Sequence, residues 1–348
     1  MRIGIVTPYD SANFGAYLQA YANMKYLESM GHSVFFVKFR SESQRKKIFF
    51  PSGNSAMSKI VNLLRRKYSE DNYLIMSKAL DIFTVVELQN LSDAKLDAVI
   101  VGSDEIWNVK VKTFQNPVFY GIENIPSFAY APSIGNASRT DFMQYDYLIN
   151  KIKKICVIGV RDQNTQNLLA SFDKEKPPIV CDPTCLLDPN QYPINGKRLI
   201  REKYILVYSY SVPLEFQKIL KKYARQRGLK LVSVCMYQRW CDKNVICKPL
   251  EFCSLIQYAE CVFTTTFHGT IFTIMQHKKC VIYAASQKLK DLLEWTNMQS
   301  VSINLNDTYE HIKFLLDNTP DYSEYEIRMK NRRNISRERY KSCLEELL

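Results

Sequence analysis

Residues 2–39 read RIGIVTPYDSANFGAYLQAYANMKYLESMGHSVFFVKF, the pattern of a strand, a helix and a second strand. The apolar run Arg2–Thr7 has the length and composition of a buried strand, and the longer stretch Asn13–Met30 follows it as a helix. Gly31 ends that helix, and Ser33–Phe39 is again short, apolar and rich in strand-forming residues. Strands joined through a helix lie parallel in one sheet, so this stretch predicts a parallel sheet covered by helices.

The same alternation continues along the chain and divides it into two units. Four more strands are expected in the first unit, at residues 97–101, 127–131, 155–160 and 179–181. Turn formers then interrupt the rhythm over residues 188–203. A second cycle follows, with strands expected at residues 204–208, 230–234, 261–265 and 280–283. We therefore predict an α/β fold of two Rossmann-like domains with parallel sheets: an N-terminal domain over 1–188, a C-terminal domain over 189–322 and a basic C-terminal helix over 323–348.

The composition is that of an ordinary globular protein. Of 348 residues, 46% are hydrophobic and 24% are charged, which excludes disordered, collagen-like and low-complexity classes. Apolar runs such as Ile271–Met275 are too short to span a bilayer. A strand is expected directly after Met1, and the ten cysteines show no disulfide framework. We expect a cytoplasmic protein with free thiols and no signal peptide.

The net charge of +12 is concentrated in two segments. Residues 38–67 hold nine Lys or Arg and one Glu, residues 326–341 hold seven and two, and the remaining chain is almost neutral. Such segments suit an anionic membrane surface or a nucleic acid, and a solvated loop and helix face explain them equally well. No zinc-finger, RNA-recognition or helix-turn-helix signature is found, so we expect no nucleic-acid partner.

Polar residues follow several of the expected strands, where ligands bind in sheets of this kind, and the cleft between the two domains is the expected site. After the first strand, Asp10 and Asn13 lead into a helix N-terminus that favours an anion or a hydroxyl-rich ligand. A simple helix cap is the alternative. Ser133 and Arg161 follow later strands, and Arg161 is placed to clamp a carboxylate or phosphate unless it pairs with a neighbouring acid.

The segment Gly102–Asn108, GSDEIWN, is the most informative in the first unit. Ser103, Asp104 and Asn108 offer groups that bind sugar hydroxyls, and the indole of Trp107 can stack on the apolar face of a hexose. A capping residue beside a buried Trp107 is the alternative.

The sharpest feature of the second unit is TTTFHGT, residues 264–270. Its hydroxyls end a strand, and His268 opens a helix next to Gly269, which allows a ligand to approach the backbone. His268 can transfer a proton near neutral pH, although a structural histidine is the alternative. Cysteines spaced six residues apart over 235–253 are not a zinc pattern, so no metal is expected.

Taken in order, these segments resemble the polysaccharide pyruvyl transferase family. The matching pieces are Asn13-Phe14-Gly15-Ala16, Gly102–Asn108, Tyr130–Gly135, Val160-Arg161, Asp182-Pro183-Thr184 with Leu186-Leu187, and Phe267-His268-Gly269-Thr270. The resemblance implies a GT-B-like fold with an active-site cleft between the domains and a C-terminal helix that crosses back to the first domain. It also implies transfer of the pyruvyl group of phosphoenolpyruvate to two hydroxyls of a sugar, as a cyclic ketal. The family's acceptors are surface-polysaccharide sugars, as in exopolysaccharide and capsule, or their lipid-linked precursors.

The role predicted for each residue combines this chemistry with the residue's position at the end of a strand. His268, Arg161 and Asp104 are expected to be catalytic: His268 protonates the enol carbon or assists phosphate departure, Arg161 holds the anion, and Asp104 takes a proton from the acceptor. The donor is expected to contact Arg161, Thr265, Thr266, His268, Gly269 and Thr270. The acceptor is expected to contact Asp10, Asn13, Ser103, Asp104, Trp107, Asn108 and Ser133. Phosphoenolpyruvate is a co-substrate, and no cofactor is expected.

One position departs from the family pattern. Many members have an arginine two residues before the histidine, where this chain has Thr266. The change is compatible with a rebuilt donor site, a different donor or lost activity. Two other functions therefore stay open: a GT-B-type nucleotide-sugar glycosyltransferase, and a non-catalytic carbohydrate- or anion-binding relative.

Overall fold

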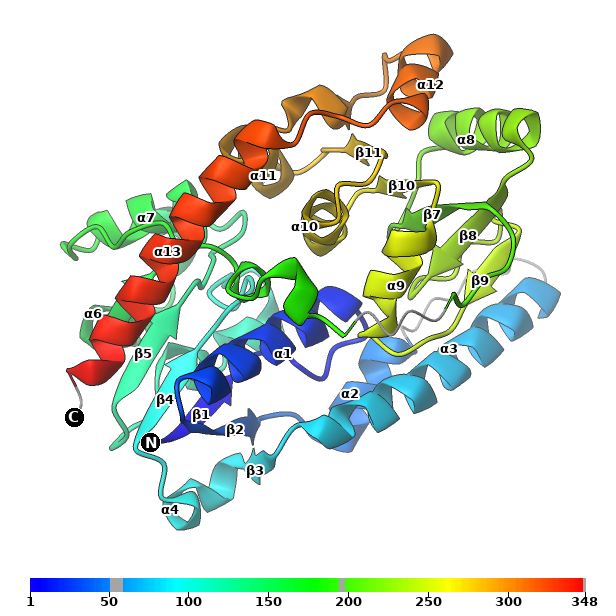
Figure 1. Ribbon diagram of the computed structural model, residues 1–348. Coiled ribbons are helices and arrows are strands. Elements are labelled where there is room, and N and C mark those ends of the chain that lie inside the picture. The colour runs from blue at the N-terminus through cyan, green and yellow to red at the C-terminus, as the bar shows by residue number, and fades with distance from the viewer. Residues whose placement is uncertain (51–58, 194–197, 347–348) are drawn as a thin grey trace.

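The computed structural model describes residues 1–50, 59–193 and 198–346, and these form two parallel sheets covered by helices (Figure 1). The first sheet has the order β3-β2-β1-β4-β5-β6. Its strands are β1 (Arg2–Val6), β2 (Ser33–Lys38), β3 (Val85–Glu87), β4 (Ala98–Val101), β5 (Ser127–Tyr130) and β6 (Cys156–Gly159). Every pairing in it is parallel, as the alternation of strands and helices predicts.

The second sheet has the order β12-β11-β10-β7-β8-β9, and its strands are also parallel. They are β7 (Tyr204–Tyr208), β8 (Lys230–Val234), β9 (Lys243–Val245), β10 (Cys261–Thr264), β11 (Cys280–Tyr283) and β12 (Ser302–Ile303). The central strands β4 and β7 are buried along their whole length, because helices cover both faces of each sheet. The prediction of two Rossmann-like domains is confirmed.

The helices lie on the two sheets and between them. The first domain carries α1 (Phe14–Ser29), α2 (Glu42–Phe49), α3 (Lys59–Ala79), α4 (Leu91–Ala94), α5 (Arg139–Phe142), α6 (Asp146–Lys154) and α7 (Gln163–Ala170). The second carries α8 (Leu214–Arg227), α9 (Glu251–Tyr258), α10 (Phe267–Met275), α11 (Gln287–Trp295) and α12 (Tyr309–Asp317), and α13 (Ser323–Glu345) follows. Residues 179–181, expected to form a strand, make only an isolated bridge from Ile179 to Val160.

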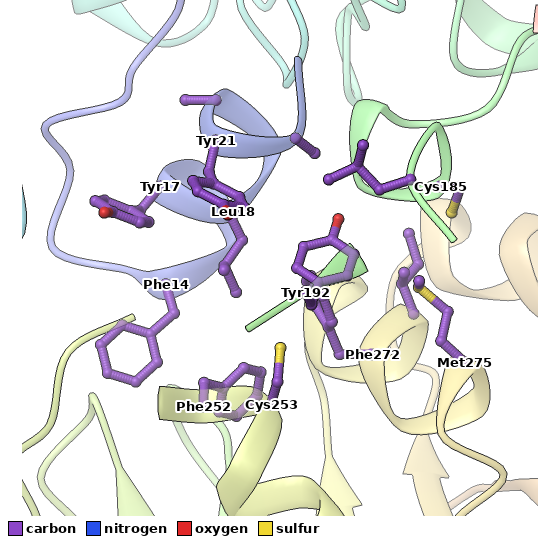
Figure 2. Close-up of a cluster of buried hydrophobic side chains, with 14 of the residues drawn as sticks. Phe14, Tyr17, Leu18, Tyr21, Cys185, Tyr192, Phe252, Cys253, Phe272 and Met275 are labelled. Atoms are coloured by element: carbon purple, nitrogen blue, oxygen red, sulfur yellow. The ribbon is translucent and has the colours of Figure 1, made fainter. Parts of the chain in front are cut away.

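An apolar cluster joins the two domains (Figure 2). Phe14 of α1 packs on Phe252 of α9, with ring centroids 5.6 Å apart, and Tyr192 packs on Phe272 of α10 at 5.1 Å. The side chains of Tyr17, Leu18 and Tyr21 extend the same contact along α1. Because this interface is apolar and continuous, it stabilises one position of α1 against α10.

Two helices cross between the domains. In α3, whose first residues belong to the basic segment 38–67, Tyr68 donates a hydrogen bond to the carbonyl of Val245 at 3.1 Å. In α13, Tyr340 donates to Asn23 Oδ1 at 2.7 Å, and Ser336 Oγ accepts from the backbone N–H of Cys181 at 2.9 Å. Figure 1 shows α13 running from the second domain back to the first. Part of segment 38–67, residues 51–58 with its expected turn, lies outside the described residues.

The described part of the chain contains no helix that is both long and apolar enough to cross a bilayer. All ten cysteines carry free thiols. Among the residues that the structure describes, no group of His, Cys, Asp and Glu side chains is arranged to hold a metal ion.

Candidate active site

Four polar side chains from both domains meet at the carboxyl ends of the strands. Asp104 follows β4, Arg161 follows β6, and Asp182 follows the bridge between Val160 and Ile179. His268 stands in the first turn of α10, which begins after β10. The structure therefore brings together the three residues expected to be catalytic and adds Asp182 to them.

Arg161 is the centre of this group. Its Nη1 lies 3.3 Å from Oδ2 of Asp182 and 3.5 Å from Oδ1 of Asp104. Its guanidinium carbon also lies 4.7 Å from the ring centroid of Phe267, a cation–π contact across the domain interface. A buried guanidinium between two carboxylates and an aromatic face is fixed in position, with a charge that its partners compensate.

The charges of the group set the protonation of both carboxylates. Burial raises the pKa of Asp104, but the charges of Arg161, His268 and Lys288 outweigh it and hold that pKa below its ordinary value. Burial likewise raises the pKa of Asp182, and His268 and Arg161 outweigh it strongly, so its pKa is far below the ordinary value. Both side chains are therefore ionised at neutral pH. Asp104 is a weak base for the same reason, which suits a binding role better than the proton acceptor expected from the sequence.

His268 is held between the domains with one ring nitrogen available. Its Nε2 is buried without a hydrogen-bond partner among the described residues and lies 3.6 Å from Asp182 Oδ2, longer than a hydrogen bond. On its other side the ring faces Gly15 of α1, where an added Cβ would lie 2.1 Å from Nδ1. A buried nitrogen without a hydrogen-bond partner destabilises the folded protein. This site therefore favours a ligand that forms a hydrogen bond with Nε2.

The contact with Gly15 leads to a prediction about ring position. In Gly15→Ala the imidazole must move away from α1, and a displacement of about 1 Å at a reacting group can cost about a hundredfold in rate. We expect a loss of that order in kcat, measured with an acceptor that supports turnover by the native protein. In the double variant with His268→Ala, Gly15→Ala should cause no further loss. An equal loss in both backgrounds would show that Gly15 acts on something other than the ring.

The hydroxyls expected at the donor site are mostly engaged within the protein. Thr266 Oγ1 caps α10 by accepting from the N–H of Gly269 at 3.0 Å, and Thr270 Oγ1 donates to the Thr266 carbonyl at 2.9 Å. Thr265 Oγ1 lies 2.7 Å from Ser209 Oγ. These bonds fix the start of α10, and therefore His268, so the structure gives the threonines a positioning role.

Three of the residues expected to contact the acceptor have structural partners within the protein. The indole of Trp107 is fully buried, stacks on Tyr120 and donates from Nε1 to the Phe119 carbonyl, so it cannot stack on a sugar. Asp10 forms a buried ion pair with Arg40. Asn13 caps α1, its Oδ1 accepting from the N–H of Ala16 at 2.7 Å. The buried-indole alternative is therefore the correct one for Trp107, whereas acceptor contacts of Asp10 and Asn13 stay a prediction.

The remaining acceptor residues lie around the cleft. Ser103 Oγ donates to the Ala131 carbonyl at 2.8 Å and lies 3.4 Å from Asp182 Oδ2, so it supports the charged group. Asn108 and Ser133 line a cavity of about 770 Å³ between the first domain and α11. Amides are frequent in its lining, which contains Asn108, Asn136, Gln163, Asn164, Asn167 and Gln287. Such a lining can donate to and accept from sugar hydroxyls.

A second cavity, of about 480 Å³, opens beside Arg161. It lies between the segments 161–163 and 179–185 and the helices α10, α11 and α13, and both Phe267 and Asp182 are in its wall. Lys288 lines both cavities, and its Nζ lies 2.5 Å from Glu105 Oε1, which joins α11 to the first domain. The two cavities therefore adjoin, one lined with amides and the other with several cations.

A family model described as polysaccharide pyruvyl transferase matches residues 13–287. The chain belongs to this family. The recognition made from the separate motifs is thereby confirmed, and the family indicates a transferase. No curated protein sequence matches the chain.

Solved structures of the same fold share little sequence with this pyruvyl transferase family member. UDP-N-acetylglucosamine 2-epimerase from Rickettsia bellii has a TM-score of 0.55 at 9% identity, with 99% of this chain and 96% of that chain covered. The UDP-GlcNAc 2-epimerase from Neisseria meningitidis has 0.53 at 11%, covering 99% and 100%. S. aureus MnaA, in a structure with UDP, has 0.52 at 14%, covering 100% and 97%. These likenesses show the two-domain, GT-B-like fold.

Two residues of this candidate site could not be singled out from the sequence. Asp182 belongs to a matching segment but not to the predicted site residues, and it contacts Arg161, Ser103 and His268. Its signal was a carboxylate directly after a short apolar run, the same signal that pointed to Asp104. Gly15 also stood in a matching segment, and only the fold shows that it faces His268.

Proposed function

We propose that this protein transfers the pyruvyl group of phosphoenolpyruvate to two hydroxyls of a sugar during the synthesis of a surface polysaccharide. The observation that carries the proposal is the buried group of Arg161, Asp182 and His268, whose Nε2 has no hydrogen-bond partner within the described chain. It adjoins one cavity lined with cations and another lined with amides. An acid, an anion clamp and an ordered diol are what this reaction needs.

The chemistry balances without a redox step. Protonation of C3 of phosphoenolpyruvate makes C2 electrophilic, one acceptor hydroxyl forms a C–O bond to C2, and the C–O bond to phosphate breaks. The second hydroxyl then bonds to C2 and closes the ketal. The acceptor loses two hydroxyl protons. One returns to the general acid in place of the proton delivered to C3, and the other leaves on the phosphate.

The side chains divide this work between them. His268 delivers the proton to C3 through Nε2 and becomes neutral, and the carboxylate of Asp182, 3.6 Å from Nε2, faces the ring while it carries that proton. Arg161 offers its remaining N–H groups to the donor's carboxylate. Asp104 and the amide-lined cavity hold the sugar, with Asn108 and Ser133 among the contacts.

A lipid-linked acceptor would suit the two basic segments. Cations of both are partly used inside the molecule: Lys38 and Arg40 pair with Glu87 and Asp10, and Arg333 and Arg337 both pair with Asp188. Any contact with an anionic membrane surface would therefore use the remaining cations of segments 38–67 and 326–341.

Thermal unfolding with and without millimolar phosphoenolpyruvate tests the donor. A ligand that binds only the folded protein raises the midpoint temperature of unfolding. At a ligand concentration of a hundred times its Kd, the free energy of unfolding rises by about 2.7 kcal/mol. We expect such a rise with phosphoenolpyruvate and none with UDP- or GDP-sugars. A rise with a nucleotide-sugar alone would point to a glycosyltransferase. Glycan binding with no response to phosphoenolpyruvate in the presence of that glycan would point to a non-catalytic protein.

A further inference from the structure

The cavity beside Arg161 receives cations from three separate elements. Its lining includes Arg161 after β6, Lys288 of α11, and Arg328 and Arg332 of α13. The C-terminal helix thus contributes to a cavity whose other walls belong to the segments 161–163 and 179–185 and to α10 and α11. Those cations that have no carboxylate partner within the protein are the ones available to an anionic ligand.

Three of these cations have a carboxylate partner. Arg161 lies between Asp104 and Asp182, Lys288 contacts Glu105, and Arg328 Nε donates to Glu324 Oε1 at 2.6 Å. These charges are therefore largely neutralised by the protein itself.

Arg332 differs from them. Its guanidinium carbon lies 4.1 Å from the ring centroid of Trp295, and no carboxylate of the described residues lies within 4 Å of its nitrogens. Burial lowers the pKa of Arg332, which reflects the cost of removing this charge from water. The nearby thiols of Cys181 and Cys185 offer no counter-charge, because burial raises the pKa of both.

The acidic residues of the lining do not supply the missing partner. Asp182 is paired with Arg161, and Asp162 caps α7 by accepting from the N–H of Thr165 at 2.8 Å. Asp291 accepts from Gln287 at 2.6 Å, and Glu294 is exposed. Arg332 is thus a partly buried guanidinium that lies over an indole ring and lines a cavity, and no carboxylate of the described residues compensates its charge.

We propose that this cavity binds a phosphate monoester and that Arg332 holds its phosphate group. The assignment rests on the proposed function, in which the ligand is phosphoenolpyruvate: its carboxylate lies toward Arg161 and its phosphate toward α13. A planar guanidinium donates two parallel hydrogen bonds to a phosphate, and the indole of Trp295 fixes its plane. The C-terminal helix then belongs to the donor site, and Arg332 is a substrate-binding residue.

Calorimetric titrations with phosphoenolpyruvate and with inorganic phosphate test this assignment. The variant Arg332→Met keeps an apolar side chain against Trp295 and removes the charge. We expect it to weaken the binding of both ligands at least tenfold, because the hydrogen bonds to a charged group are lost. Arg332→Lys should lie between native protein and Arg332→Met, since it keeps the charge without the fork. Arg339→Met removes one charge from an exposed position of the same helix and should change binding less than twofold.

The outcomes separate the two proposals. If native protein binds phosphoenolpyruvate and folded Arg332→Met binds it equally well, the assignment of Arg332 is wrong and the proposed function stands. If native protein binds inorganic phosphate through Arg332 but not phosphoenolpyruvate, the anion site stands and the proposed donor is wrong. Binding of neither ligand overturns both. An equal loss of affinity in Arg332→Met and Arg339→Met would show that binding depends only on the net charge of the protein. That result would also overturn the assignment.

Discussion

Replacing His268 with alanine should lower kcat by about 10²–10⁴-fold while phosphoenolpyruvate still binds. The range is that of removing a general acid or base from an otherwise intact site. Nε2 of His268 is the buried polar atom of this site that has no hydrogen-bond partner within the described chain, and it lies 3.6 Å from Asp182, which lines the cavity beside Arg161. Phosphate release from phosphoenolpyruvate, with an acceptor that the native protein uses, measures the loss.

The controls for this variant separate chemistry from folding. His277 lies in the same domain, is exposed and contacts Glu326, so His277→Ala should keep the native rate. Circular dichroism and the unfolding midpoint should show that His268→Ala is folded, since the ring contributes no hydrogen bond within the described residues. A folded His268→Ala protein with a near-native rate would exclude His268 as the proton donor.

Much of the fold could be predicted because the central strands are long and apolar. β1, β4, β7 and β10 are continuous runs buried on both faces, and such runs stand out between helices. The edge strands β3, β9 and β12 were missed. They have three, three and two residues, too few to show a period, and they exist because a neighbouring strand offers unpaired backbone groups.

The site was predictable where a residue's role follows from its place at a strand end. Asp104, Arg161 and His268 follow strands that meet at one edge of each sheet, and the two edges face each other across the cleft. The prediction that Trp107 contacts the acceptor was wrong, because a position in a loop does not tell which side chains face inward. Asp104 has a φ of 85°, and after this turn Ile106 and Trp107 are both buried in the core.

Contacts between distant segments could not be predicted from local pattern. The hydroxyls of Thr265 and Thr266 looked available to a ligand, but Ser209 and the start of α10 engage them. Arg332 belonged to a basic segment whose alternatives were a membrane surface and a solvated helix face. Its position over Trp295 depends on how α13 crosses between the domains, which no local pattern encodes.

Arg161→Met should destabilise the protein by about 3–5 kcal/mol at pH 7, the usual cost of leaving a buried charge without its partner. Methionine keeps most of the volume and the contact with Phe267, so the expected loss is electrostatic. Two carboxylates, the buried Asp182 and the partly buried Asp104, would lose the cation that lies within 3.5 Å of both. Urea unfolding measures the change, and Arg66→Met, which breaks an exposed pair with Glu70, should stay within about 0.5 kcal/mol of native.

The dependence on pH identifies the cause of that loss. In the native protein the pKa values of Asp104 and Asp182 are lowered, so their stabilising contribution is present above the pKa of an unfolded aspartate, about 3.9, and is lost as pH falls through the folded values. Without Arg161, a positive charge that lowers the pKa of both carboxyls is gone, so burial raises their pKa values. The folded variant then binds protons at a higher pH than the native protein does, and the difference in stability between them should narrow from pH 7 to pH 4. A constant difference over this range would mean that packing around the guanidinium, rather than its charge, holds the two carboxylates in place.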